Sequence, residues 1–148
     1  MSDSELSEEF RRIYTEWGDA IAEKRHDWLE DFFADDFLGT AQPWPTLIVD
    51  KRQMIDLDKA IEAMDTVWVK VEAQRIGEDV LTVGHVRYLR EDFRDGAAIG
   101  EGMPSGSQIA QLTKGKIAVY TNAWRHNGKR WQCYDHHLVA VIEDKGFD

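Results

Sequence analysis

Cysteine, proline and long apolar runs are all scarce in this sequence. The 148 residues include one cysteine, Cys133, and three prolines. A single cysteine cannot form a disulfide within the chain and is typical of a reducing compartment, so the sequence predicts a cytoplasmic protein. No run approaches the roughly 18 consecutive apolar residues of a membrane-spanning helix. The acidic start, MSDSELSEEF, also lacks the apolar centre of a signal peptide, so a membrane protein is not expected.

Positive charge is scarce as well. The chain has 18 Lys and Arg against 28 Asp and Glu, which gives a formal net charge of −10. Nucleic acids and anionic membranes attract the opposite sign of charge, so we expect neither as a partner. The length is that of one ordinary domain and no repeat is visible. Residues 1–148 are therefore predicted to form a single domain with a core and one pocket.

Motifs that bind metals or cofactors are lacking too. There is no CxxC, HExxH or Asp-rich loop, and Asp135 with His137 would supply only two metal ligands. Residues 95–107, DGAAIGEGMPSGS, contain glycines spaced as in a phosphate-binding loop, but no helix is expected after them and Glu101 would repel a phosphate. We interpret this segment as a flexible loop that could cover a pocket. We predict neither a metal nor a cofactor.

Helical periodicity dominates the N-terminal half of the chain. Apolar residues recur every three or four positions over residues 4–25, after a capping box formed by Ser2 and Glu5. A second helix is predicted to start at Asp27 and a third after Asp50, because each has Glu or Gln three residues later. Farther along, the apolar period changes from about 3.6 to 2, which predicts an antiparallel meander. Helices followed by such a meander favour an α+β fold with a curved antiparallel sheet around the helices.

The last hairpin, Tyr120 to Val141, contains the most informative polar residues. Its Asn127-Gly128 dipeptide favours a two-residue turn that pairs residue 126 with residue 129. Because side chains alternate along a strand, this register predicts one polar face that carries Tyr120, Asn122, Cys133, Asp135 and His137. The other face is predicted to be apolar enough to form a homodimer, and it carries Thr121, Ala123, Tyr134, His136, Leu138, Ala140 and Ile142.

The order of the elements and the segments WLEDFFADDF, IGEDVLTVG and NAWRHNGKRWQCYDHH resemble the nuclear transport factor 2-like superfamily, especially its SnoaL-like and ketosteroid-isomerase-like branches. The resemblance implies a cone-shaped pocket between a concave sheet and the first helix, with dimerisation through the convex face. Members include isomerases, dehydratases, lyases and non-catalytic binding or assembly domains. The isomerases carry a catalytic aspartate at the end of the first strand, where this chain has no carboxylate between Leu38 and Gln42.

We therefore predict a cofactor-independent lyase, dehydratase or isomerase that acts on a small hydrophobic, aromatic molecule. A non-catalytic ligand-binding or assembly domain is the alternative. His137 would exchange the proton and Asp135 would orient it, while Tyr120 or Tyr14 would hydrogen-bond a developing oxyanion. Water elimination and aldehyde release would use the same groups. The predicted substrate-binding residues are Asn122, Trp17, Trp44, His85, Arg87 and Cys133.

These residues also have purely structural interpretations. Asp135 and His137 could be a buried pair that satisfies its own hydrogen bonds. His85 and Arg87 share a strand face that could meet solvent or a second subunit instead of a ligand. Cys133 could be a structural thiol, which is the usual state of a buried cysteine.

Overall fold

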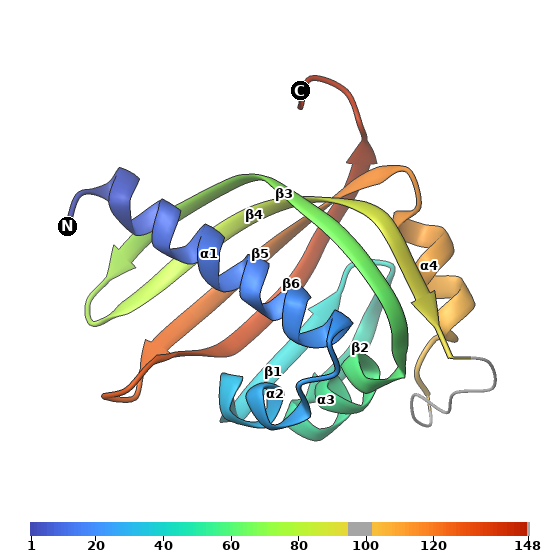
Figure 1. Cartoon of the computed structure of the whole chain (residues 1–148), viewed down its shortest axis with the longest axis horizontal. Coiled ribbons are helices and arrows are strands. Elements are labelled where there is room, and N and C mark those ends of the chain that lie inside the picture. The colour runs from blue at the N-terminus through green and yellow to red at the C-terminus, as the bar shows by residue number, and fades with distance from the viewer. Residues whose placement is uncertain (95–101, 148) are drawn as a thin grey trace.

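The computed structural model describes residues 1–94 and 102–147. A six-stranded sheet in the order β2-β1-β6-β5-β4-β3 curves around one long helix, α1, which lies across its concave face (Figure 1). The elements in chain order are α1 (Asp3–Ala22), α2 (His26–Phe32), β1 (Phe33–Ala41), β2 (Trp44–Asp50), α3 (Lys51–Ala60), β3 (Ile61–Ile76), β4 (Asp79–Phe93), α4 (Gly106–Thr113), β5 (Lys116–His126) and β6 (Trp131–Glu143). This is the predicted α+β architecture, with an open sheet wrapped around helices.

Two of the three predicted helix starts are confirmed. The Ser2 hydroxyl accepts a hydrogen bond from the backbone N–H of Glu5 at 3.1 Å, and Asp50 caps α3 in the same way. The predicted cap at Asp27 is wrong. The helix α2 begins one residue earlier, and its N-cap residue, Arg25, makes no side-chain capping bond. A helix of this length is held by its packing, because Leu29 and Phe32 are buried.

The sheet departs from the prediction in one pairing. β1 runs parallel to β6, whereas the other neighbouring strands are antiparallel, so the sheet is mixed. The parallel pair joins the first and last strands of the chain, a contact that no local turn signal can reveal. β2 lies at the edge of the sheet, where its Pro45 removes no hydrogen bond from a central ladder.

The helix α4 was not predicted. Its N-cap is Ser105, whose hydroxyl accepts a hydrogen bond from the backbone N–H of Gln108 at 3.1 Å, while the Gln108 side chain accepts from the Ser105 backbone N–H. This Ser-x-x-Gln capping box is present in the sequence, but the surrounding glycines favoured a loop. The statement that no helix follows the glycine-rich segment was therefore wrong. Residues 95–101 of that segment lie outside the described residues, and the predicted covering loop with them.

The core is built around aromatic side chains that α1 places on the concave face of the sheet. The Tyr14 ring stacks on Trp68 with ring centroids 4.0 Å apart and meets Trp124 edge-on at 5.5 Å. The Thr82 hydroxyl lies 2.7 Å from the Tyr14 hydroxyl and accepts the Trp124 indole N–H at 2.9 Å. The polar atoms of both rings are therefore satisfied inside an apolar core. Within residues 1–94 and 102–147, no helix is long and apolar enough to span a membrane.

Close packing between β3 and β4 gives a first prediction. A Cβ atom on Gly84 would lie 2.6 Å from Cζ3 of the Trp68 indole, which the Tyr14 ring holds in place. We expect Gly84→Ala to lower the free energy of unfolding by about 1–3 kcal/mol, the usual cost of overpacking, as measured by urea unfolding. Ile48 on the edge strand β2 is 60% exposed, so Ile48→Ala is the control and should cost less than about 1 kcal/mol. Equal stability of the two variants would contradict this packing.

Candidate functional site

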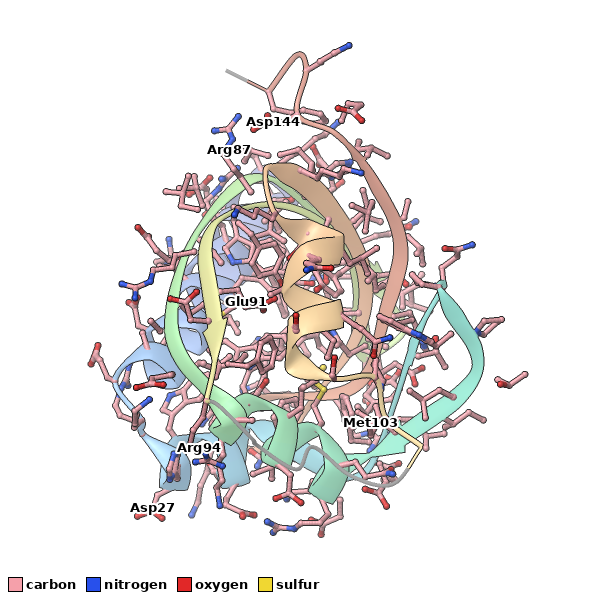
Figure 2. All side chains as sticks on the ribbon, turned by 90° about the vertical axis from the view of Figure 1, so that its right-hand side faces the viewer. Asp27, Arg87, Glu91, Arg94, Met103 and Asp144 are labelled. Atoms are coloured by element: carbon pink, nitrogen blue, oxygen red, sulfur yellow. The ribbon has the colours of Figure 1, made fainter. Side chains whose placement is uncertain are left out.

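A cavity of about 140 Å³ lies between the concave face of the sheet and the helices α1, α3 and α4. Its walls are mainly apolar, with Ile21 from α1, Met54 and Leu57 from α3, and Ile109 and Leu112 from α4. In Figure 2 the helix α4 stands in front of the open end of the curved sheet, so it covers the wide end of the cone. Elsewhere, a cavity of about 150 Å³ with aliphatic and aromatic walls is large enough to bind benzene. The cavity can therefore hold a molecule built on one ring.

The ionisable side chains on the cavity wall come from five different elements. They are Tyr14, Asp58, Tyr88, Glu91, Tyr120 and His136. Among the described lining residues there is no Lys or Arg. The two carboxyl groups are therefore not neutralised by a basic side chain in the wall, and burial controls their protonation.

Asp58 projects into the cavity from α3 and is only 3% exposed. Its Oδ2 accepts a hydrogen bond from the Trp17 indole N–H at 3.1 Å. Burial raises the pKa of Asp58 to about 8, while the Trp17 hydrogen bond opposes the rise and the nearby Glu91 adds to it. Asp58 therefore carries its proton at neutral pH and can donate it to a ligand.

Glu91 is the second carboxyl group of the cavity, and it is half-buried. It lies near the end of β4, between that strand and α4 in Figure 2. Burial raises its pKa to about 7, and a long hydrogen bond of 3.5 Å from the Thr113 hydroxyl of α4 opposes the rise. A carboxyl group with this pKa is ionised in about half of the molecules at neutral pH, which suits a general base.

Tyr88 and Tyr120 form a hydroxyl pair on the same wall. Their oxygens are 2.9 Å apart, and burial raises the pKa of both phenols well above the usual value. Both hydroxyls are therefore protonated, and the hydrogen bond that joins them uses only one of their two protons. The second proton remains available for an oxygen atom of a ligand.

His136, on β6, is the remaining ionisable residue of the described cavity wall. Its Nδ1 lies 3.1 Å from Oδ1 of Asn122, and its ring stacks on Tyr120 and meets Trp17 edge-on, with ring centroids 4.6 Å and 4.9 Å apart. Burial lowers the pKa of His136 to about 3, and the neighbouring His137 lowers it further. The imidazole is therefore neutral in the folded protein.

The predicted register of the last hairpin is wrong. His126 pairs with Trp131, so the loop contains residues 127–130, and the Asn127 N–H donates to the Arg130 carbonyl at 3.0 Å. Farther along, the register shifts again where Tyr134 is an extra residue on β6. Such a bulge reverses which side chains face the concave side. The concave face therefore carries His136, where the two-residue turn had placed His137.

The structure separates the predicted catalytic residues into two groups. Tyr14 and Tyr120 line the cavity, together with the predicted binding residues Trp17 and Trp44. Asp135 and His137 do not line it. They lie 3.6 Å apart on the opposite side of β6, where the Nδ1 atom of His137 is 2.7 Å from the Thr40 hydroxyl. Their predicted place on the polar inner face is therefore corrected.

The remaining predicted binding residues also lie outside the cavity wall. Asn122 is 2% exposed and Cys133 is fully buried, and they contact each other behind His136. Burial raises the pKa of the Cys133 thiol far above its usual value, which agrees with a structural role. Arg87 forms a two-bond ion pair with Asp144, and the His85 ring lies 5.6 Å from Phe147, so both lie against the C-terminal segment.

Four ionisable residues of the cavity were missed: Asp58, Tyr88, Glu91 and His136. Asp58 had a signal in the sequence, because it follows Met54 by four residues and precedes Ile61 by three, on the apolar stripe of α3. A carboxyl group on such a stripe is unusual. Glu91 had no comparable signal, since a register shift in the β3–β4 ladder changes the alternation before it. In residues 1–94 and 102–147 no three His, Cys, Asp or Glu side chains are placed to hold a metal ion.

Comparison with known proteins identifies the fold. No family model matches the sequence, and no curated protein matches it. A nuclear transport factor 2-like protein of Cytophaga hutchinsonii is similar over 93% of this chain and 97% of its own, with a TM-score of 0.62 and 16% identity. A Streptomyces avermitilis protein of the same fold family, provisionally assigned as a dehydratase, aligns over 92% of this chain and 96% of its own at 12% identity and a TM-score of 0.60. The association domain of Caenorhabditis elegans calcium/calmodulin-dependent kinase II matches over 91% and 95% at 12% identity, with a TM-score of 0.59.

The chain therefore has the nuclear transport factor 2-like fold, as the sequence resemblance predicted. At these identities the similarity concerns the fold alone, and the structures that share it include both a provisional enzyme and an assembly domain. The narrower assignment to the SnoaL-like branch remains a prediction.

The protonation of Asp58 gives a second prediction, on the pH dependence of stability. The pKa of Asp58 is about 8 in the folded protein, whereas an aspartate in an unfolded chain titrates near about 3.9. Between these values the unfolded chain binds fewer protons, so the Asp58 contribution to stability is full below about pH 4 and is lost as the pH rises to 8. Asp58→Asn has no carboxyl group at this position and avoids this loss. We therefore expect the melting temperature of Asp58→Asn, relative to that of the wild type, to increase as the pH is raised from 5 to 8.

Asp56→Asn is the control for this measurement. Asp56 lies on the same helix, and its side chain is 48% exposed beside Arg52. Its difference from the wild type should stay constant over the same pH range. If the Asp58→Asn difference were also constant, Asp58 would not hold its proton in the folded protein.

Proposed function

We propose that this protein is a cofactor-independent enzyme that transfers protons on a small, apolar, aromatic molecule. The observation that carries the proposal is a pair of carboxyl groups, the buried Asp58 and the half-buried Glu91, in one mainly apolar cavity. Burial raises the pKa of these groups to about 8 and about 7, close to the pH at which the protein would work. Buried acids with such pKa values in a cavity are typical of sites for general acid–base catalysis.

The different pKa values of Asp58 and Glu91 support different catalytic roles for the two carboxyl groups. Glu91, with the lower pKa, would accept a proton from the substrate, and Asp58 would donate one. The free hydroxyl proton of the Tyr88–Tyr120 pair would hydrogen-bond negative charge that develops on a substrate oxygen. Isomerisation, water elimination and aldehyde release all need this set: a base, an acid and a donor for the oxygen. The proposal includes these three reaction types as one class.

The cavity wall also restricts the substrate. Glu91 is partly ionised at neutral pH and the described lining residues include no Lys or Arg, so the wall would repel carboxylate, phosphate or sulfate groups. Its apolar and aromatic side chains favour a ring. The strand end where the isomerases carry their aspartate contributes Thr40 and Ala41 to the wall, so the base proposed here comes from β4 instead.

Activity can be tested without a known substrate. In D2O, phenylacetone would report proton abstraction by uptake of deuterium beside the carbonyl, and 1-phenylethanol would report dehydration by formation of styrene. We expect Glu91→Gln and Asp58→Asn to slow the wild-type reaction about 10²–10⁴-fold, as followed by mass spectrometry, because general acid–base groups are typically worth that much. His137→Gln is the control, since His137 lies outside the cavity. An unchanged rate in both carboxyl variants would contradict the assignment.

A non-catalytic binding or assembly domain is the second candidate function. It is favoured by the similarity to a kinase association domain and by apolar side chains on the outer face of the sheet. Leu81, Val83 and Val139 on β4 and β6 are 45%, 40% and 43% exposed. We define these three residues as the outer apolar patch, and a twofold dimer would bury it. Binding of the probes above without any turnover would favour this candidate.

Dimer formation through the outer apolar patch is a further prediction. We expect the wild type to be dimeric at micromolar concentration in light scattering and Val83→Glu to be monomeric, because a buried unpaired carboxylate is costly. The control is Ile48→Glu on the edge strand β2, at a side chain that is 60% exposed outside the patch. A monomeric wild type, or a dimeric Val83→Glu protein, would exclude this interface.

A further inference from the structure

A chain of three hydrogen bonds lies behind the cavity wall and ends at His136. The Cys133 thiol contacts the backbone carbonyl of Asp135 at 3.2 Å. The Asn122 side-chain nitrogen lies 3.5 Å from the Cys133 sulfur, and its oxygen lies 3.1 Å from His136 Nδ1. Cys133 and Asn122 are buried and no ionised group is part of this chain, so its proton positions follow from the chemistry of the atoms.

The donor and the acceptor of each hydrogen bond can be assigned by starting from the Asp135 carbonyl, which has only one possible role. A backbone carbonyl only accepts, so the Cys133 thiol proton is donated to Asp135. The sulfur must then accept from Asn122, which places the amide N–H groups of Asn122 on that side. The amide oxygen of Asn122 is left facing His136, and it accepts a hydrogen bond from Nδ1–H. The neutral imidazole is thereby held as the tautomer that has a bare Nε2.

This bare Nε2 is open to the cavity. His136 lines the cavity, and the described residues, 1–94 and 102–147, donate no hydrogen bond to Nε2. The ring cannot easily turn away, because Tyr120 stacks on one face and Trp17 packs edge-on. The cavity therefore offers one fixed, uncharged hydrogen-bond acceptor, in addition to the donors on Tyr88, Tyr120 and Asp58.

We propose that His136 recognises a hydroxyl group of the ligand and that the ligand class is a small phenol or aromatic alcohol. In this assignment Asn122 is a positioning residue, which selects the tautomer of His136. A hydroxyl is the smallest neutral group that can donate to Nε2 while an apolar ring fills the cavity. An ammonium group would instead pair with Glu91 or Asp58, and a ketone has no proton to donate. The inference rests on the cavity of the proposed function and specifies its substrate.

Discrimination by such an acceptor is measurable because a ligand without the hydroxyl leaves Nε2 unpaired. Sites built to bind a hydroxyl reject analogues that lack it much more strongly than apolar pockets reject one extra methylene. Phenol and toluene are a matched pair, since both carry one ring and one small substituent. We expect the wild type to bind phenol at least tenfold more tightly than toluene in calorimetric titrations.

Two variants, with His137→Phe as their control, separate recognition from folding. His136→Phe keeps a ring stacked on Tyr120 but has no acceptor, so its preference for phenol over toluene should fall to about onefold. His137 lies outside the cavity, so His137→Phe should keep the full preference. Asn122→Asp should weaken the preference near neutral pH although His136 remains. Its carboxylate would stabilise the imidazolium, which has a proton on Nε2. The preference should return as the pH is raised above the new imidazole pKa.

Nitrogen-15 NMR of the wild type tests the tautomer directly and does not depend on any variant that fails to fold. We expect the proton on Nδ1, and we expect the Nε2 resonance to move when phenol is added and to stay when toluene is added. A proton on Nε2, or an unchanged phenol preference in folded His136→Phe, would overturn the inference.

These tests measure binding and the tautomer of His136, so they are independent of turnover. Loss of phenol recognition with intact turnover would refute this inference alone, and intact recognition without turnover would refute the proposed enzyme alone.

Discussion

A strongly curved sheet must fill its concave side, and in this protein one helix fills only part of it. The aromatic side chains of α1 pack tightly where Tyr14 and Trp124 share the Thr82 hydroxyl. Beyond this point the sheet widens, and α3 and α4 close the space without filling it. The cavity is therefore a consequence of the mismatch between a straight helix and a widening cone, and its position follows from where α1 ends.

The polar groups of the cavity show how this space differs from ordinary core. Each carboxyl group has one hydrogen-bond donor, Trp17 for Asp58 and Thr113 for Glu91, and neither has a basic partner in the described wall. Such groups destabilise the fold once they ionise, because their charge is not compensated. A purely structural cavity would be more stable with apolar residues at these two positions. The cost to stability is understandable if the groups serve chemistry, which is the basis of the proposed function.

Local signals in the sequence were sufficient for much of the fold. The capping boxes at Ser2 and Asp50 and the change to a period of two gave the order of helices and strands, and the family resemblance gave the cone. The inward face of the last hairpin was not predictable in the same way. A dipeptide such as Asn127-Gly128 favours a two-residue turn, but here the loop has four residues. The longer loop keeps the same side chains on each face, whereas the bulge at Tyr134 exchanges the two faces of β6 beyond it.

Alternation along a strand carries no information about such insertions, so one unrecognised extra residue exchanges His137 for His136. Prediction of the site was therefore weaker than prediction of the fold. Tyr14, Trp17 and Tyr120 line the cavity, and each follows the simple periodicity of its helix or strand; Trp44 also lines it, although it lies between two prolines. Asp58 and Glu91 depend on how separate elements meet in space, which a single sequence does not encode locally.

The parallel pairing of β1 with β6 has a consequence for how the molecule assembles. Thr40 and His137, which meet across this pair, are separated by 97 positions in the chain. β6 also lies inside the sheet, between β1 and β5, although it is the last strand to be synthesised. The β1–β2 hairpin cannot join the sheet until the ribosome has released β6, and closing so long a loop is entropically slow. The two halves of the cavity wall, one early and one late in the chain, can therefore come together only after β6 has been synthesised.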